Sequence, residues 1–157
     1  MKEIYYKNKY FLNETRMELN PFYNFILGTH EYEESIKQNH FDKYIKDNIC
    51  SINTYNNEYR YFVCNKKYDI KTFPNIYFSN VEANNTFELK NSDLFIQIKD
   101  NWYFEIIFPI INLKPERWVV GKIFFRKYLV GFSPDSEASL ISFYINPNGG
   151  DNNNSNK

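Results

Sequence analysis

The sequence predicts a mainly β domain with one principal helix, at about residues 30–47. Aromatic residues make up 20% of the 157 residues, and aromatic and β-branched side chains favour strands. After Tyr59, short apolar segments alternate with turn residues, which is typical of an all-β architecture rather than of βαβ units. A chain of this length forms one domain, or one half of a larger one.

The first strands are expected before residue 20. Apolar and polar residues alternate over 4–12 and again over 17–19, with turn residues at Asn13 and Glu14 between them. This pattern predicts a hairpin of these two segments. Pro21 has no N–H to give to a strand ladder, so the second strand should end there.

The segment 30–47 has the periodicity of an amphipathic helix. Its apolar positions recur every four residues, at Tyr32, Ile36, His40 and Tyr44. Thr29 is the expected N-cap and Asn48 the expected end of the helix. Acidic residues in the first turn and lysines in the last turn suit the helix dipole.

Eight short strands are predicted beyond the helix, together with a short helix over 121–127. The strands cover residues 59–64, 75–79, 86–89, 94–98, 102–108, 118–120, 128–132 and 140–145. The final segment, 146–157, is rich in Asn and has almost no apolar residue, so we expect it to be disordered. The folded domain is therefore predicted to span 1–145.

The composition argues against two classes of partner. Nineteen basic residues balance nineteen acidic ones, whereas proteins that neutralise nucleic-acid phosphates carry an excess of Lys and Arg. No segment approaches the roughly 20 apolar residues of a membrane span, and the N-terminus has no apolar run of signal-peptide length. We expect neither a nucleic-acid partner nor a membrane span.

Motifs for metals, cofactors and nucleophiles are not evident. His30, His40, Cys50 and Cys64 are too far apart in sequence to form the close ligand pairs of a structural zinc site. The two cysteines could form one bridge or remain two buried thiols. The acidic cluster Glu31, Glu33 and Glu34 is interpreted as a solvated helix start rather than as catalytic carboxylates. No metal and no cofactor are therefore expected.

One segment resembles a known family. Residues 118–128 read WVVGKIFFRKY, in which a Trp, two apolar residues and a Gly lead into a short helix. This resembles the C-terminal signature of pepsin-like aspartic proteases. Upstream, Cys64 followed by 73–78 (FPNIYF) is similar to the family's cysteine and the strand after it, and 86–96 to the next strand pair. The resemblance covers about 1–145 and implies a single lobe of the pepsin-like fold.

In this family each of two lobes contributes one Asp from an Asp-Thr/Ser-Gly loop. Two carboxylates at hydrogen-bond distance hold one proton between them, so one acts as a base on water while the other polarises the peptide carbonyl. In this chain Asn20, Pro21 and Phe22 stand at the three positions of that loop. An amide cannot share a titrating proton, and proline supplies no hydroxyl. The resemblance therefore implies an inactive relative.

The resemblance also carries expectations about binding and about the cysteines. Asn24, Phe25 and Ile26 follow the altered loop and would belong to what remains of a peptide-binding cleft. The family's usual partner of Cys64 would lie near 100–104, where this chain has no cysteine, so Cys50 is the expected partner in an oxidising compartment. The family implies the secretory or vacuolar pathway, although the chain shows no signal peptide.

Two alternatives remain open from the sequence. The chain could be the C-terminal half of an active aspartic protease whose N-terminal lobe it lacks, and that lobe or a peptide would then be its partner. The second alternative is an unrelated small β-rich interaction domain, for which the resemblance is accidental. The gene upstream and the fold would separate these alternatives.

Overall fold

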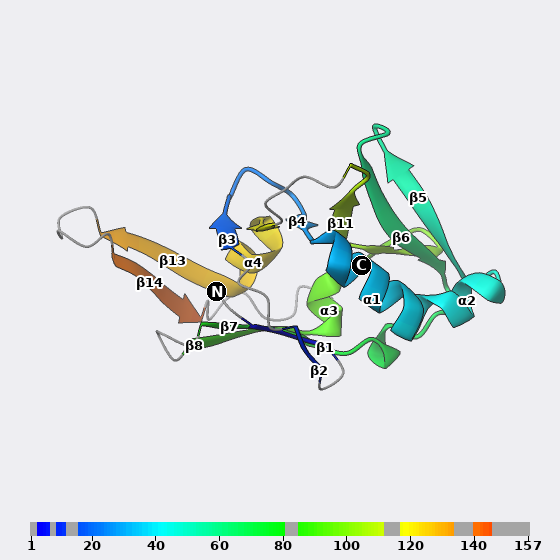
Figure 1. Ribbon diagram of the computed structural model, residues 1–157, viewed down its shortest axis with the longest axis horizontal. Helices are drawn as coiled ribbons and strands as arrows, with labels where there is room; N and C mark the ends of the chain where they lie inside the picture. The colour runs from blue at the N-terminus through cyan, green and yellow to red at the C-terminus, as the bar shows by residue number, and fades with distance from the viewer. Residues whose placement is uncertain are drawn as a thin grey trace, which may run out of the picture.

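The computed structural model describes residues 3–6, 9–11, 16–80, 85–111, 117–133 and 140–145. The expectation of a mainly β fold with one principal helical segment is confirmed. The described strands form a four-stranded sheet, a larger mixed sheet and a two-stranded hairpin (Figure 1). The predicted tail, 146–157, lies outside the described residues.

The four-stranded sheet is antiparallel and has the order β2-β1-β7-β8. Its strands are β1 (Glu3–Tyr6), β2 (Lys9–Phe11), β7 (Ile76–Asn80) and β8 (Asn85–Leu89). The predicted hairpin between 4–12 and 17–19 is wrong, because β1 pairs with β2 and the second segment joins the other sheet. A period of two indicates a strand but does not identify its partner.

The larger sheet has the order β3-β12-β4-β11-β6-β10-β9, with β5 on the other side of β6. Its strands are β3 (Arg16–Leu19), β4 (Ile26–Leu27), β5 (Cys50–Tyr55), β6 (Tyr59–Asn65), β9 (Phe95–Ile98), β10 (Asn101–Phe104), β11 (Ile106–Pro109) and β12 (Arg117–Val120). β12 runs parallel to β3 and antiparallel to β4. The loop from β3 to β4 therefore crosses a strand that comes from much later in the chain.

Two details of this sheet differ from the sequence prediction. The predicted strand 102–108 is divided at Glu105, so that β10 pairs with β9 and β11 pairs with β4. The strand β5 was not predicted, because most of its side chains are exposed and it carries no apolar alternation. β5 is held as a strand by its long pairing with β6, from Cys50–Cys64 to Tyr55–Tyr59.

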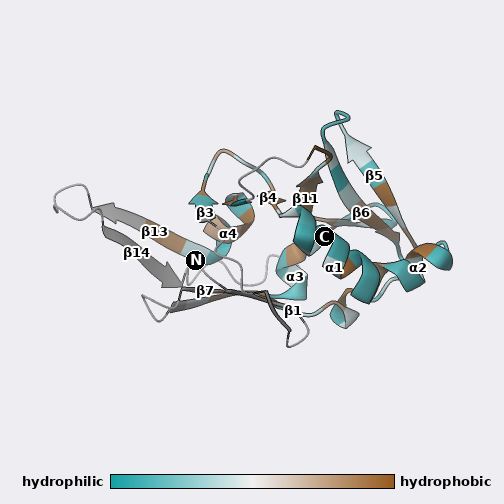
Figure 2. Cartoon of the chain, in the orientation of Figure 1, coloured by the Kyte–Doolittle hydropathy of each residue, from teal (hydrophilic) through white to brown (hydrophobic). Residues whose placement is uncertain are grey.

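The helical segment is continuous but changes its pitch. It consists of α1 (His30–Ile36), the π-helical turn η1 (Lys37–Phe41) and α2 (Asp42–Lys46). The Thr29 hydroxyl accepts a hydrogen bond from the N–H of Tyr32 at 3.3 Å, which confirms the expected N-cap. Asn48 has a φ of 55°, in the left-handed region that Asn tolerates beyond a helix end. The exposed side of the segment is largely hydrophilic (Figure 2).

An aromatic core joins the helical segment to both sheets. Phe41 stacks on Phe62 with 4.1 Å between ring centroids, so the π turn anchors the helix on β6. Trp118 of β12 contacts Tyr32 of α1 at 4.9 Å and Phe78 of β7 at 5.2 Å. These contacts place the two sheets and the helix around one core.

Three short helices and a hairpin complete the described elements. They are η2 (Ile70–Thr72), α3 (Asn91–Leu94), α4 (Lys122–Lys127), β13 (Tyr128–Ser133) and β14 (Leu140–Ile145). The predicted short helix after residue 121 is confirmed as α4. β13 and β14 form a hairpin that extends away from the body, at the left of Figure 1. None of the described helices is long and apolar enough to cross a membrane.

Candidate functional site

The loop between β3 and β4 forms a tight turn at the positions that the resemblance assigns to catalysis. The Asn20 carbonyl accepts a hydrogen bond from the N–H of Tyr23 at 3.2 Å, and its side-chain Oδ1 accepts one from the N–H of Phe22 at 3.1 Å. Asn20 thus uses its side-chain oxygen to shape the turn. Pro21 and Phe22 project outward, and Phe22 is 90% exposed.

Backbone hydrogen bonds connect this loop to the end of β12 and to the residues that follow it. The N–H of Asn20 donates to the carbonyl of Val120 at 3.0 Å, and the N–H of Lys122 donates to the carbonyl of Tyr23 at 2.8 Å. A Cβ at Gly121 would collide with the carbonyl oxygens of Tyr23 and Phe25. Glycine is therefore required here because loop and strand backbones approach closely.

A carboxylate lies beside the turn but is already paired. The side-chain amide of Asn20 is 3.5 Å from Glu18 Oε1, and Arg117 forms an ion pair with the same carboxylate at 3.1 Å. Glu18 and Arg117 lie on the neighbouring parallel strands β3 and β12. The turn therefore offers hydrogen bonding and apolar contact rather than a pair of carboxylates that share a proton.

The residues expected to bind a peptide separate into two groups. Asn24 is exposed and Phe25 is half-buried, so both can contact a ligand at the surface. Ile26 is fully buried in β4, and its side chain belongs to the core. Ile26 contributes only to the position of the loop, through the hydrogen bond from its N–H to the carbonyl of Glu105 at 3.0 Å.

A row of aromatic rings leads away from the loop. Tyr23 contacts Phe25 at 5.4 Å between centroids, and Phe25 contacts Tyr59 at the start of β6 at 6.2 Å. Partial burial raises the pKa of the Tyr59 hydroxyl, and the neighbouring Tyr23 and Glu58 raise it further. The Tyr59 hydroxyl therefore remains a neutral donor. We call Tyr23, Phe25 and Tyr59, together with the exposed Phe22, the aromatic row.

The aromatic row is not evident as a unit in the sequence. In the sequence, Tyr59 is recognisable only as the beginning of a predicted strand, and Tyr23 carries no signal of its own. Their contact depends on how β4 and β6 flank β11, which no local pattern reveals. Ile110 and Ile111, exposed just beyond β11, add apolar surface near Glu58, whose carbonyl accepts the N–H of Ile110 at 2.8 Å.

The interpretation of the acidic cluster as a solvated helix start is wrong for Glu33. Glu31 is exposed, but Glu33 is only 2% exposed and binds Arg60 of β6 through both carboxylate oxygens, at 2.8 and 2.7 Å. His30 Nδ1 lies 3.3 Å from the same carboxylate. A buried carboxylate requires such partners, so this contact fixes α1 on the large sheet rather than forming a catalytic site.

The other candidate ligands are also engaged structurally. His40 is buried, and its Nε2 lies 2.6 Å from the Tyr68 hydroxyl. Cys50 and Cys64 form a disulfide between the facing positions of β5 and β6, with 4.0 Å between their Cα atoms. Within the part of the chain that the structure describes, no group of three or more His, Cys, Asp or Glu residues could hold a metal ion.

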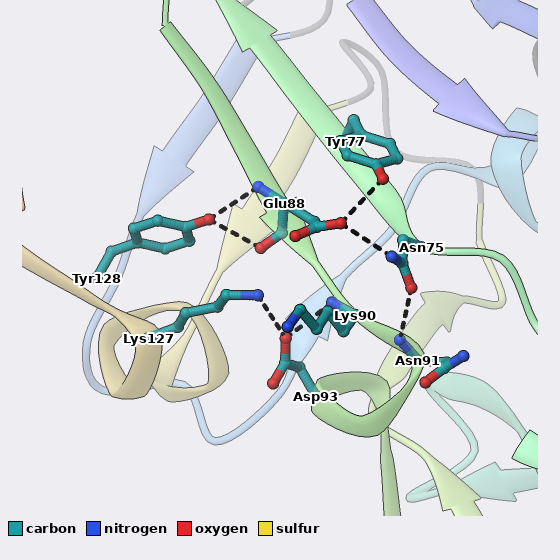
Figure 3. A network of polar contacts seen from close by, with 8 residues as sticks. All are labelled: Asn75, Tyr77, Glu88, Lys90, Asn91, Asp93, Lys127 and Tyr128. Atoms are coloured by element: carbon teal, nitrogen blue, oxygen red, sulfur yellow. Dashed lines mark hydrogen bonds and ion pairs between the residues drawn. The ribbon is translucent and has the colours of Figure 1, made fainter. Parts of the chain in front are cut away.

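A polar network anchors the segment that carries the family resemblance (Figure 3). The Lys127 ammonium of α4 binds Asp93 Oδ2 of α3 at 2.8 Å, and Asp93 also accepts the N–H of Lys90. Next to it, Glu88 Oε1 accepts hydrogen bonds from Asn75 and Tyr77, each at 2.9 Å. The Lys127–Asp93 contact ties α4, which directly follows β12 and Gly121, to α3.

Comparisons with known proteins bear on the fold. No family model matches the chain, and no curated protein matches it. Among solved structures, the chain is similar to conglutin gamma, a basic 7S globulin from lupine seeds, with a TM-score of 0.62 and 7% sequence identity. The match covers 82% of this chain and 33% of that chain, so this chain spans about a third of the length of conglutin gamma. At this identity the likeness shows the fold alone.

Proposed function

We propose that this chain is a C-terminal-lobe homologue of pepsin-like aspartic proteases that has lost catalysis and uses the remaining surface to bind an extended peptide. One observation carries the proposal. Two segments that the resemblance identifies separately, 20–22 and 118–128, meet in space through the Asn20–Val120 and Lys122–Tyr23 hydrogen bonds. An accidental resemblance gives no reason for the two segments to be neighbours.

The chemistry of the turn supports the loss of catalysis. Asn20 has no titrating proton, and its side-chain oxygen already accepts the N–H of Phe22. Pro21 supplies neither a hydroxyl nor an N–H. The outward Phe22 ring occupies the position of the family's glycine, where a substrate backbone would have to approach. Even a misplacement of about 1 Å can reduce a rate on the order of a hundredfold.

The aromatic row supports peptide binding. Phe22 and the half-buried Tyr23, Phe25 and Tyr59 provide apolar contact, and the Tyr hydroxyls can bond to a peptide backbone. Exposed aromatic clusters of this kind mark binding surfaces more often than single exposed residues do.

The catalytic part of the proposal is tested with a quenched peptide library at acid pH. Wild type, Asn20→Asp, and the triple variant with Asn20→Asp, Pro21→Thr and Phe22→Gly are compared. We expect no cleavage by wild type or by Asn20→Asp, because a single carboxylate has no partner in the same chain. Pepstatin-sensitive cleavage by wild type would overturn the inactive assignment and favour the active-protease alternative.

The binding part is tested with the same library in a form that reports binding. Phe22→Ser should weaken the retention of apolar peptides, whereas Leu129→Ser, at an exposed apolar position on β13, should not. The aromatic row is not a peptide site if wild type retains no peptide. The same conclusion follows if both variants retain peptides as well as wild type does.

A further inference from the structure

The π-helical turn η1 buries a histidine between α1 and α2. His40 is 3% exposed, and Phe41, the next residue, is fully buried. Their rings are almost perpendicular, with 5.1 Å between the centroids. Phe41 stacks on Phe62 of β6, and His40 next to it contacts the segment 68–73. Turns of this kind are rare in helices and occur frequently at functional sites.

Aromatic rings pack around the imidazole of His40. With 4.9 to 6.0 Å between centroids, it contacts the rings of Phe41, Tyr44, Tyr68 and Phe73. Its Nε2 atom lies 2.6 Å from the hydroxyl of Tyr68, which is itself only 2% exposed. A tyrosine hydroxyl can donate to a neutral imidazole nitrogen, so the uncharged ring is satisfied without water. Rings attract a cation, but that attraction is smaller than the loss of hydration that a buried charge suffers.

The lysines near this ring also favour its neutral form. The two stretches that meet at His40, 37–47 and 66–73, carry three aspartates and six lysines, namely Lys37, Lys43, Lys46, Lys66, Lys67 and Lys71. The Lys43 ammonium lies 4.5 Å from the centroid of the Tyr44 ring, and this ring contacts His40 at 5.5 Å. A positive charge nearby disfavours a second one.

The carboxylates of the same elements are engaged in other contacts or point to solvent. Asp42 pairs with Lys37 at 3.9 Å, and Asp69 Oδ1 accepts a backbone N–H of its own loop at 3.0 Å. Asp47 is exposed just after α2. The buried Glu33 of α1 is bound through both oxygens by an arginine of β6. The surroundings of His40 therefore suit an uncharged imidazole better than a charged one.

His40 lies where α2 meets the segment 66–73. Beside it, the Tyr44 hydroxyl lies 3.2 Å from Thr72 Oγ1. The rings of Tyr44 and Tyr68 contact each other edge to face at 5.0 Å. Because His40 contacts both of these tyrosine rings, a charge on it would weaken the packing that joins the two segments.

We propose that His40 is a pH-sensitive switch: its neutral ring holds α2 on the segment 66–73, and its protonation releases α2. An exposed imidazole has a pKa of about 6.5. The released form binds a proton more readily than the closed form, so acid below this pH favours release and a higher pH favours closure. The Glu33–Arg60 contact keeps α1 on the large sheet while α2 opens. This inference does not depend on the proposed function.

The test is hydrogen exchange of the whole chain at about pH 7.5 and about pH 5, corrected for the intrinsic exchange rate. We expect the protection of residues 40–47 and 66–73 in wild type to fall at least roughly tenfold at the lower pH. His40→Phe matches the surrounding rings and His40→Gln keeps a hydrogen-bonding group, and neither ionises in this range. Both variants should retain their protection at the lower pH.

The chain offers a matched control, because it has only two histidines. His30→Gln removes the other one, which is 39% exposed, and should respond to pH as wild type does. Circular dichroism at the higher pH verifies that each variant is folded.

Three results would overturn the proposal. The first is protection of both segments in wild type that is the same at the two pH values. The second is a loss in His40→Phe and His40→Gln as large as in wild type, because another group would then carry the response. The third is a loss that extends equally to β10 and β12, because the whole fold rather than α2 would then open.

Discussion

The hydroxyl of Tyr128 bonds to both backbone groups of Glu88. It accepts a hydrogen bond from the Glu88 N–H at 2.8 Å and donates one to the Glu88 carbonyl at 2.9 Å (Figure 3). Among the described strands β8 is at the edge of its sheet, so the tyrosine replaces a neighbouring strand at one residue. Burial is the main reason that the pKa of Tyr128 is raised, and the hydroxyl keeps its proton.

Tyr128→Phe should therefore destabilise the protein. The substitution keeps the ring contacts with Phe87 and Phe124 but leaves the N–H and carbonyl of Glu88 without this partner. We expect a loss of about 1–3 kcal/mol in the free energy of unfolding, measured with urea. Tyr55→Phe, at an exposed position, should change it by less than about 0.5 kcal/mol. Equal effects of the two variants would show that the Tyr128 hydroxyl contributes no stability.

The Glu33–Arg60 pair should be costly to break from one side. Arg60→Leu leaves the buried Glu33 carboxylate with His30 alone, so we expect a loss of roughly 3 kcal/mol or more. The double variant Glu33→Leu with Arg60→Leu removes both charges and should be more stable than Arg60→Leu. Urea titrations of wild type, Arg60→Leu and the double variant measure these free energies of unfolding. A double variant that is less stable than the single one would contradict the account.

Glu105 should make stability fall as the pH rises. Burial raises the pKa of its carboxyl above the ordinary value of 4.5, although Arg126 opposes the shift. The protonated carboxyl fits the folded state better, so this contribution is present below 4.5 and is lost as the pH passes the folded-state pKa. Glu105→Gln has no carboxyl to ionise at this position, so its stability does not fall with pH for this reason. Its unfolding free energy should therefore improve relative to wild type between about pH 4 and pH 7, and a constant difference would contradict the shift.

The disulfide should stabilise the hairpin of β5 and β6. Cys50 and Cys64 are separated by 14 positions, and closing a loop of roughly 15 residues contributes about 3 kcal/mol. The double variant Cys50→Ser with Cys64→Ser should have a free energy of unfolding lower than that of wild type by about this amount, measured with urea. A reducing agent should lower the free energy of unfolding of wild type to that of the double variant. It should leave the free energy of unfolding of the double variant unchanged. If the agent changes neither protein, the cysteines are not bridged in solution.

Much of the fold was predictable because local rules and tertiary packing agree. The helical segment has its cap at Thr29, its apolar positions four residues apart and its end near Asn48, and all three are found in the structure. The π turn was not predictable, because it depends on seating Phe41 against Phe62 on another element. The same limit applies to β5, which only its pairing with β6 makes a strand.

The site was predictable in its positions but not in its surroundings. The turn at Asn20 lies between two strands, as the loop prediction requires. The burial of Glu33 could not be derived from its place in an acidic cluster, because its partner Arg60 lies on a different element. The contact of Phe25 with Tyr59 likewise depends on the order of the strands. Sequence patterns indicate which side of a helix or strand is apolar, but not which other element packs against that side.

The position of β12 between β3 and β4 also determines the order of assembly. β3 and β4 are close in sequence but are bridged by a strand from late in the chain. During synthesis β3 and β4 must wait for their partner until Val120 has left the ribosome, and contacts between such distant residues slow folding. Until then the edges of β3 and β4 that will pair with β12 remain open. A nascent chain in this state is exposed to aggregation until its last third is made.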